Sequence, residues 1–199
     1  MPSPPVRSEL IILLHGWTGD ENSMDIFVRA LPCDDWLISP RAPVSAEGRG
    51  YSWFMARPDA PDARGEFEKT GTQLWIQIME WKRILDITSS TPITLVGFSQ
   101  GGAMALLLSF LYAEQVKKAA CLSGYLPIWG GDLIKPNSLI KKPYLITHGI
   151  TDQLIPIERA RISKTILENA GAEVTYCEGA VAHKLSADCF TALEEFFAN

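Results

Sequence analysis

The sequence predicts an α/β protein with a mainly parallel sheet of about six strands and helices on both faces. Short apolar runs alternate with longer amphipathic segments, as in chains built from strand–helix–strand units. The runs have no polar face, which is typical of strands covered by helices on both sides. The chain has 199 residues, of which 47% are hydrophobic and 21% charged, as in an ordinary globular domain. We therefore expect one domain over residues 1–199, with residues 1–8 as a flexible arm.

Six apolar runs are the expected strands. In chain order they are Leu10–Leu14, Trp36–Ser39, Ile93–Val96, Ala119–Leu122, Tyr144–Thr147 and Val174–Cys177. Five segments between and after them have the pattern of helices. In chain order these are Asn22–Leu31, Glu66–Asp86, Gln100–Ala113, Pro156–Ala170 and Ala187–Phe197. The third is apolar nearly all round, which predicts a central buried helix.

The charge balance excludes several function classes. Lys and Arg total 18 against 23 Asp and Glu, a formal net charge of −5. Nucleic-acid binders need a positive excess, so a nucleic-acid partner is not expected. The most apolar stretch, Ala103–Leu111, is far shorter than the roughly 20 residues of a membrane span. The first residues have no basic segment of a signal peptide. These observations predict a cytoplasmic protein.

The four cysteines indicate neither a disulfide framework nor a metal site. Cys33, Cys121, Cys177 and Cys189 are far apart and form no C-x-x-C pair. We therefore expect reduced, mostly buried thiols and no bound metal.

The segment Gly97-Phe98-Ser99-Gln100-Gly101 matches the pattern G-x-S-x-G. It follows an expected strand and precedes an expected helix, where the pattern describes a sharp turn that exposes a nucleophilic serine. Side chains two positions to either side would collide, so Gly97 and Gly101 have a steric reason to lack a Cβ. The alternative is a glycine-rich turn with a surface serine.

A serine nucleophile needs a base, and the chain has three histidines. Hydrolases with this turn carry the serine, the acid and the histidine in that order. His15 precedes Ser99, and His148 ends the fifth expected strand. Only His183 leaves room for an acid after Ser99, so we predict that it is the base. His15 and His148 are expected to be scaffold residues that form hydrogen bonds near strand ends.

The acid should follow a strand end on the same rim of the sheet. Asp152, four residues beyond His148, meets this condition. Asp132 lies in an irregular segment and Asp188 follows the histidine, so both are poorer candidates. An ordinary turn role remains the alternative for Asp152.

Two backbone N–H groups usually bind the oxyanion that forms during acyl transfer. One comes from the residue after the nucleophile, here Gln100. We assign the other to Trp17, in the turn after the first strand. The alternative is an ordinary turn rich in glycine and aspartate.

At these residues the chain resembles the phospholipase/carboxylesterase family of α/β-hydrolases, which includes the acyl-protein thioesterases. The matching pieces run in family order along almost the whole chain. They are Leu14-His15-Gly16-Trp17, Gly19-Asp20-Glu21, Pro40-Arg41-Ala42-Pro43, Tyr51-Ser52-Trp53-Phe54, Gly97–Gly102, His148-Gly149, Asp152, Ile155-Pro156 and His183. The resemblance implies an α/β-hydrolase fold, a Ser99–Asp152–His183 triad and oxyanion donors at Trp17 and Gln100. Two departures are a short chain before the first strand and Trp17, where a smaller apolar residue is common.

The function expected from these residues is hydrolysis of a small-molecule carboxylic ester or thioester, without metal or organic cofactor. Apolar residues on the expected rim loops predict a site for an apolar acyl or aryl group, although each aromatic could instead pack in the core. They are Trp53, Phe54, Trp129, Leu154 and Ile155. The rival readings are a serine hydrolase of a peptide or carbon–carbon bond and a non-catalytic binding protein of the same fold.

The hydrolase strand order, applied to six strands, is 2-1-3-4-5-6. It puts Trp36–Ser39 and Val174–Cys177 at the sheet edges, where unpaired backbone invites pairing. We therefore predict a weak preference for a homodimer. The interval Ser123–Pro143 is short and rich in proline and glycine, so no lid domain is expected.

Overall fold

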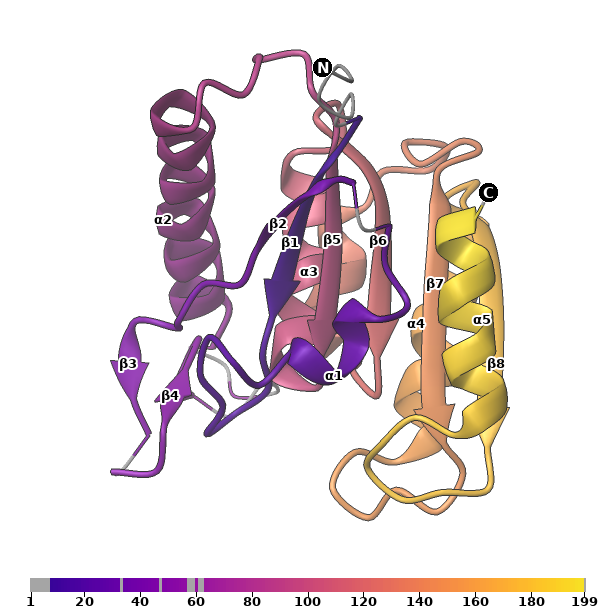
Figure 1. Cartoon of the computed structure of the whole chain (residues 1–199). Helices are drawn as coiled ribbons and strands as arrows, with labels where there is room; N and C mark the ends of the chain where they lie inside the picture. The colour runs from indigo at the N-terminus through magenta and orange to yellow at the C-terminus, as the bar shows by residue number, and fades with distance from the viewer. Residues whose placement is uncertain (1–7, 33, 47, 57–59, 61–62, 199) are drawn as a thin grey trace.

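The computed structural model describes residues 8–32, 34–46, 48–56, 60 and 63–198. Its centre is a six-stranded sheet in the order β2-β1-β5-β6-β7-β8, and all its strand pairs are parallel (Figure 1). The predicted order and the two predicted edge strands are confirmed. The strands are β1 (Leu10–Leu14), β2 (Trp36–Ile38), β5 (Ile93–Phe98), β6 (Val116–Leu122), β7 (Pro143–Gly149) and β8 (Glu173–Gly179).

Helices cover both faces of this sheet, as the apolar strands predict (Figure 1). Helix α1 (Asp25–Val28) and helix α5 (Ala187–Ala198) pack on one face, in a cluster that includes Phe27, Leu193 and Phe196. The other face carries α2 (Ala63–Ile84), α3 (Gln100–Leu111) and α4 (Ile157–Asn169). Helix α3 is buried along almost its whole length, as predicted. Within the described part of the chain, no helix combines the length and the apolar character needed to cross a membrane.

Helix α1 is much shorter than the predicted helix over Asn22–Leu31. The Asp20 side chain accepts hydrogen bonds from the Asn22 N–H at 3.0 Å and the Ser23 hydroxyl at 2.9 Å. These bonds keep the preceding residues in a turn, because a short polar side chain competes with the helical backbone pattern. At the other end, Pro32 disfavours helical geometry at the residue before it.

Three short elements have no counterpart in the prediction. The strands β3 (Val44–Ser45) and β4 (Tyr51–Ser52) form an antiparallel pair, and η1 (Ile128–Leu133) is a 3₁₀-helix. The interval from 123 to 142, where a cap would be inserted, contains only η1. The expected arm over residues 1–8 lies outside the described residues except for Ser8, whose N–H donates to the Asp35 carboxylate at 2.9 Å.

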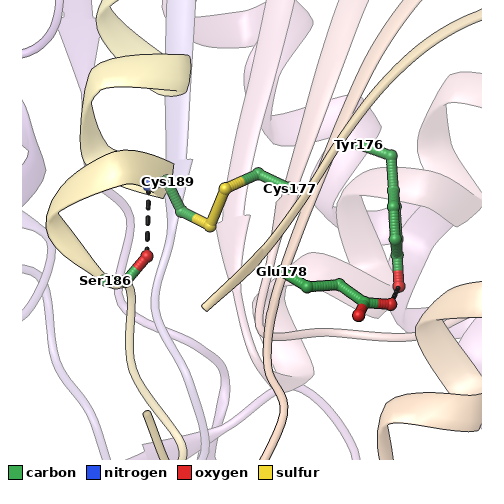
Figure 2. Close-up of a disulfide and its surroundings, with 5 residues drawn as sticks. All are labelled: Tyr176, Cys177, Glu178, Ser186 and Cys189. Carbon is green, nitrogen blue, oxygen red and sulfur yellow. Dashed lines mark hydrogen bonds between the residues drawn. A yellow bond between two sulfur atoms is a disulfide. The ribbon is translucent and has the colours of Figure 1, made fainter. Parts of the chain in front are cut away.

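The prediction of reduced cysteines is wrong for two of the four. Cys177 at the end of β8 and Cys189 in the first turn of α5 form a disulfide (Figure 2). The reason is tertiary: α5 packs on the end of β8, which brings the two Cα atoms to 5.5 Å, a normal separation for a disulfide. Cys121 is a free, buried thiol, in agreement with the prediction, and Cys33 lies outside the described residues.

Candidate active site

Ser99 stands in the tight turn between β5 and α3. Its backbone has φ 54° and ψ −116°, a region that a residue with a Cβ seldom adopts. The Ser99 N–H donates to the carbonyl of Leu122 at 2.8 Å, which ties the turn to the neighbouring strand β6. Strain of this kind persists only where the surroundings impose it, and it is common at reactive residues. The turn has the backbone form expected for an exposed nucleophile.

The two flanking glycines are required by close backbone contacts, as predicted. A Cβ on Gly97 would lie 2.0 Å from the carbonyl oxygen of Gly101. A Cβ on Gly101 would lie 2.0 Å from the carbonyl oxygen of Leu14, on β1. Neither contact can be relieved by moving a side chain, because both partners are backbone atoms. The start of α3 therefore sits directly on β1 and β5, with Ser99 at the carboxyl end of the sheet.

Asp152 and His183 meet at the same end of the sheet, from the loops after β7 and β8. The His183 Nδ1–H donates to Asp152 Oδ2 at 2.6 Å. Because the carboxylate accepts at Nδ1, the other ring nitrogen of His183 is left able to accept a proton. The His183 ring packs against Phe98, the residue before Ser99, with ring centroids 5.1 Å apart. The pair thus lies beside the Ser99 turn.

The environment of Asp152 keeps its carboxyl ionised. Burial, the largest single influence, disfavours the charge. Hydrogen bonds from the Ile155 N–H, the His183 ring and the Leu154 N–H outweigh it, so the pKa of Asp152 lies below its ordinary value. The two amides reach Oδ1 at 3.0 Å and 2.9 Å, which leaves Oδ2 directed at His183. An ionised carboxylate held in this way can orient an imidazole and stabilise its cationic form.

The other two histidines are buried and form hydrogen bonds, as the sequence predicts for scaffold residues. His15 Nε2 accepts from the Ala42 N–H at 3.0 Å, so its proton is on Nδ1, which donates to Gly16 O at 2.7 Å. Burial lowers the pKa of His15, which keeps this ring neutral. His148 Nε2 donates to the carbonyl of Ile155 at 2.9 Å and also lies 3.4 Å from Asp152 Oδ2. His148 therefore supports the loop that holds Asp152.

Two backbone amides are available for an oxyanion next to Ser99. In the turn after β1, the Thr18 and Gly19 N–H groups donate to Tyr51 O and Gly16 O, both at 3.0 Å. The Trp17 N–H has no acceptor among the described residues. The Gln100 N–H belongs to the first turn of α3, where amides have no acceptor within the helix. A Cβ on Gly16 would lie 3.3 Å from Ser99 Cβ, so the first of these turns adjoins the serine.

The Gln100 side chain has a structural role of its own. Its amide nitrogen donates to Phe54 O at 2.8 Å, and its oxygen accepts from the Trp53 N–H at 2.9 Å. This buried amide holds the segment after β4 against the start of α3. The Trp53 indole N–H donates to His15 O at 2.8 Å, at the beginning of the turn after β1.

This arrangement changes the interpretation of the predicted substrate residues. Trp53, 1% exposed, and Phe54, whose ring lies tilted against that of Phe67, belong to the core, which favours a packing role for both. Trp129, in η1, forms a T-shaped ring contact with the same Phe67. Leu154 is 76% exposed and Ile155 is half-buried, and both follow Asp152 on the rim. None of the five lines the cleft that adjoins His183.

That cleft is open, measures about 840 Å³ and lies between the turn after β1, helix α1 and the loop before α5. Gly16, Trp17 and His183 are among the residues that line it. Aromatic rings form much of its wall: Phe27 packs against Phe98 and Phe190, with centroids 6.0 and 6.1 Å apart. The sequence gives no local sign of this cleft, because its walls come from segments far apart in the chain.

Among the residues that the structure describes, no group of three or more His, Cys, Asp or Glu side chains is arranged to hold a metal ion. The groups that the arrangement offers for chemistry are a strained serine, an Asp–His pair and two backbone amides beside an aromatic cleft.

Several proteins of similar sequence or structure are named carboxylesterases. Two similar proteins come from Oryza sativa subsp. japonica. One is named a probable carboxylesterase (28% identity over 172 residues), and the match covers 81% of this chain but 63% of that protein. The other is named a probable inactive carboxylesterase (30% identity over 195 residues), with 90% of this chain and 78% of that protein covered. The crystal structure of a Bacillus cereus carboxylesterase superposes with a TM-score of 0.83 at 22% identity, over 95% of this chain and 87% of that one.

The model of one protein family matches residues 3–199, nearly the whole chain. The six-stranded parallel sheet has the form that this match implies. The chain belongs to the phospholipase/carboxylesterase family of α/β-hydrolases.

Proposed function

We propose that this chain hydrolyses small, apolar acyl or aryl esters and thioesters through a Ser99–His183–Asp152 triad and an acyl-enzyme. The observation that carries the proposal is the convergence at one rim of a strained serine and a hydrogen-bonded Asp–His pair. Ser99 follows β5, while Asp152 and His183 follow β7 and β8. Packing of the core alone does not explain why a serine, a histidine and an aspartate from three separate loops lie together at this rim.

The proposed reaction begins when Ser99 Oγ attacks the acyl carbon. His183 Nε2 takes the hydroxyl proton, and Asp152 Oδ2 stabilises the imidazolium across the 2.6 Å hydrogen bond. The carbonyl oxygen becomes negative and accepts hydrogen bonds from the Trp17 and Gln100 N–H groups. The leaving alcohol or thiol departs with the proton from His183. Water then repeats the same steps on the acyl-enzyme, which releases the acid and restores Ser99.

The cleft supports the apolar part of the proposal. His183 protonates the leaving group, so that group lies on the side of the cleft that His183 lines. The walls there are Phe27, Phe98 and Phe190, and flat rings of this kind favour an aryl or other apolar group. Trp17 is 60% exposed at the cleft edge, where its indole can cover a bound substrate.

One relative is named inactive, so a non-catalytic binding protein of the same fold is the second candidate. Labelling with a fluorophosphonate separates the two, because the reagent bonds only to an activated serine. We expect one label per chain in the wild type and none in Ser99→Ala. An unlabelled, folded wild-type protein would favour the binding function.

The substrate bond is tested with nitrophenyl esters and matched thioesters of increasing acyl length, together with aminoacyl amides. The proposal expects the highest kcat/KM among short esters or thioesters. A preference for the amides would move the chain to the rival class of serine hydrolases that cleave peptide bonds.

A further inference from the structure

The Cys177–Cys189 disulfide closes the loop that carries His183. The two cysteines are 12 residues apart, and His183 stands midway between them. Cys177 is anchored in β8, where it pairs with Thr147 of β7. Cys189 is buried in the first turn of α5. The bridge therefore joins the two elements from which the loop departs.

The two ends of this loop are held differently. Near β8, the Ile150 N–H donates to Gly179 O at 2.8 Å, and the Thr151 N–H donates to Val181 O at 3.1 Å. These bonds tie the first half of the loop to the segment that also carries Asp152. The second half, from His183 onward, depends on where α5 begins. There Ser186 Oγ accepts from the Cys189 N–H at 3.2 Å, as Figure 2 shows.

The end of β8 is also held on its other face. The side chains of Tyr176 and Glu178 point away from the disulfide (Figure 2). Tyr176 donates to Glu178 at 2.7 Å, and Arg161 of α4 forms an ion pair with the same carboxylate at 2.7 Å. The strand is thus fixed to α4 by a salt bridge and to its neighbour β7 by the sheet. The disulfide adds a covalent tie between β8 and the start of α5.

We propose that Cys177 and Cys189 are positioning residues: their disulfide holds His183 at the distance and angle that proton transfer with Ser99 and Asp152 needs. The inference rests on the proposed function, because it takes His183 as the base. With the bridge open, the start of α5 can shift against β8 and the second half of the loop moves with it. Displacement of a catalytic group by about 1 Å can cost about 100-fold in rate.

A consequence is that activity responds to a dithiol reductant. Reduction breaks the sulfur–sulfur bond and gives two thiols, while the two thiols of the reductant lose two electrons and two protons and become a disulfide. Cys121 does not interfere: it is buried, and burial raises the pKa of its thiol to about 12, so it carries almost no thiolate.

The test compares wild type, Cys177→Ser, Cys189→Ser and the double variant, with and without dithiothreitol. We expect kcat to fall about 100-fold in every variant and in the reduced wild type. The double variant should equal each single one and should not respond to dithiothreitol, because all three lack the same bond. Glu178→Gln is the matched control: it loosens the opposite face of the same strand end, keeps the bridge and should retain kcat.

A second readout does not depend on turnover. The His183 Nδ1 proton, held at a 2.6 Å hydrogen bond, should give a far-downfield proton NMR signal in the oxidised protein. We expect this signal to broaden or vanish on reduction and in the double variant.

A lower melting temperature with an unchanged kcat and an unchanged signal would assign the disulfide to stability alone and overturn the inference. So would a thiol titration that finds Cys177 and Cys189 free in the protein purified without reductant. If oxidised wild type shows the signal but no ester hydrolysis and no fluorophosphonate label, the proposed function fails instead, and the NMR comparison still decides the positioning role.

Discussion

Asp152→Asn isolates the orienting role of the acid, because the surrounding hydrogen bonds dictate how the new amide must lie. The Leu154 and Ile155 N–H groups both donate to Oδ1, at 2.9 and 3.0 Å. An amide –NH₂ cannot accept those bonds, so the asparagine oxygen must keep the Oδ1 position. Its nitrogen then occupies the Oδ2 position and donates toward His183. The ring is forced to carry its proton on Nε2, where it can no longer accept one from Ser99.

The expected loss in kcat is about 10⁴-fold, the size found when a triad acid is replaced by its amide and the histidine takes the wrong tautomer. The fold should survive, because both backbone bonds to Oδ1 remain. The assay is kcat/KM for a short nitrophenyl ester, with Asp132→Asn as the control for a distant carboxylate. A variant that keeps more than about a tenth of wild-type kcat would show that Asp152 does not orient the base.

The Asp152→Asn variant also tests how the free energy of unfolding depends on pH. The pKa of Asp152 is lower in the folded protein than its ordinary value. A carboxylate of this kind stabilises the fold above its unfolded pKa and loses that contribution as pH falls through its folded pKa. The difference in unfolding free energy between wild type and Asp152→Asn should therefore be constant above about pH 5 and shrink below about pH 4. Urea titrations across this range provide the measurement, and a difference that grows toward low pH would contradict the reasoning.

The remaining predictions concern the nucleophile, its turn, the missing lid and the sheet edge. Ser99→Ala should lower kcat by about 10⁴-fold or more with little change in melting temperature, since only one γ-oxygen is lost. Gly101→Ala should yield little folded protein on expression, because its Cβ would lie 2.0 Å from Leu14 O. Rate against concentration of a short-chain ester should saturate simply; a sharp rise at the solubility limit would indicate a lid. Light scattering at high micromolar concentration should detect some dimer, and a pure monomer would remove that expectation.

The sheet was predictable because each strand is a short apolar run that can be recognised from its own few residues. Runs such as Leu10–Leu14 carry no polar residue to mark an exposed face, so each could only be a strand covered on both sides. The turn at Ser99 was predictable for a similar reason, since its two glycines and its serine lie within five residues. The positions of Asp152 and His183 followed from their order along the chain once the strands were placed.

The features that escaped prediction all depend on contacts between distant segments. The disulfide needs α5 to lie against β8, and no spacing of two cysteines reveals that packing. The cleft wall joins Phe27, near the start of the chain, to Phe190, near its end. Trp53 and Phe54 stand in a segment with the composition of a rim loop, and only the Gln100 side chain shows why that segment is drawn into the core.

The three residues of the candidate site are held by different kinds of contact. Backbone atoms of β1 and β5 lie against the serine turn, and the carbonyl of Leu122 in β6 accepts a hydrogen bond from its Ser99 N–H. Asp152 is held by two amides of its own loop and by the histidine. His183 lies in the loop between β8 and the start of α5, and the one covalent cross-link among the described residues joins these two elements. The disulfide therefore constrains the loop that carries the proposed base.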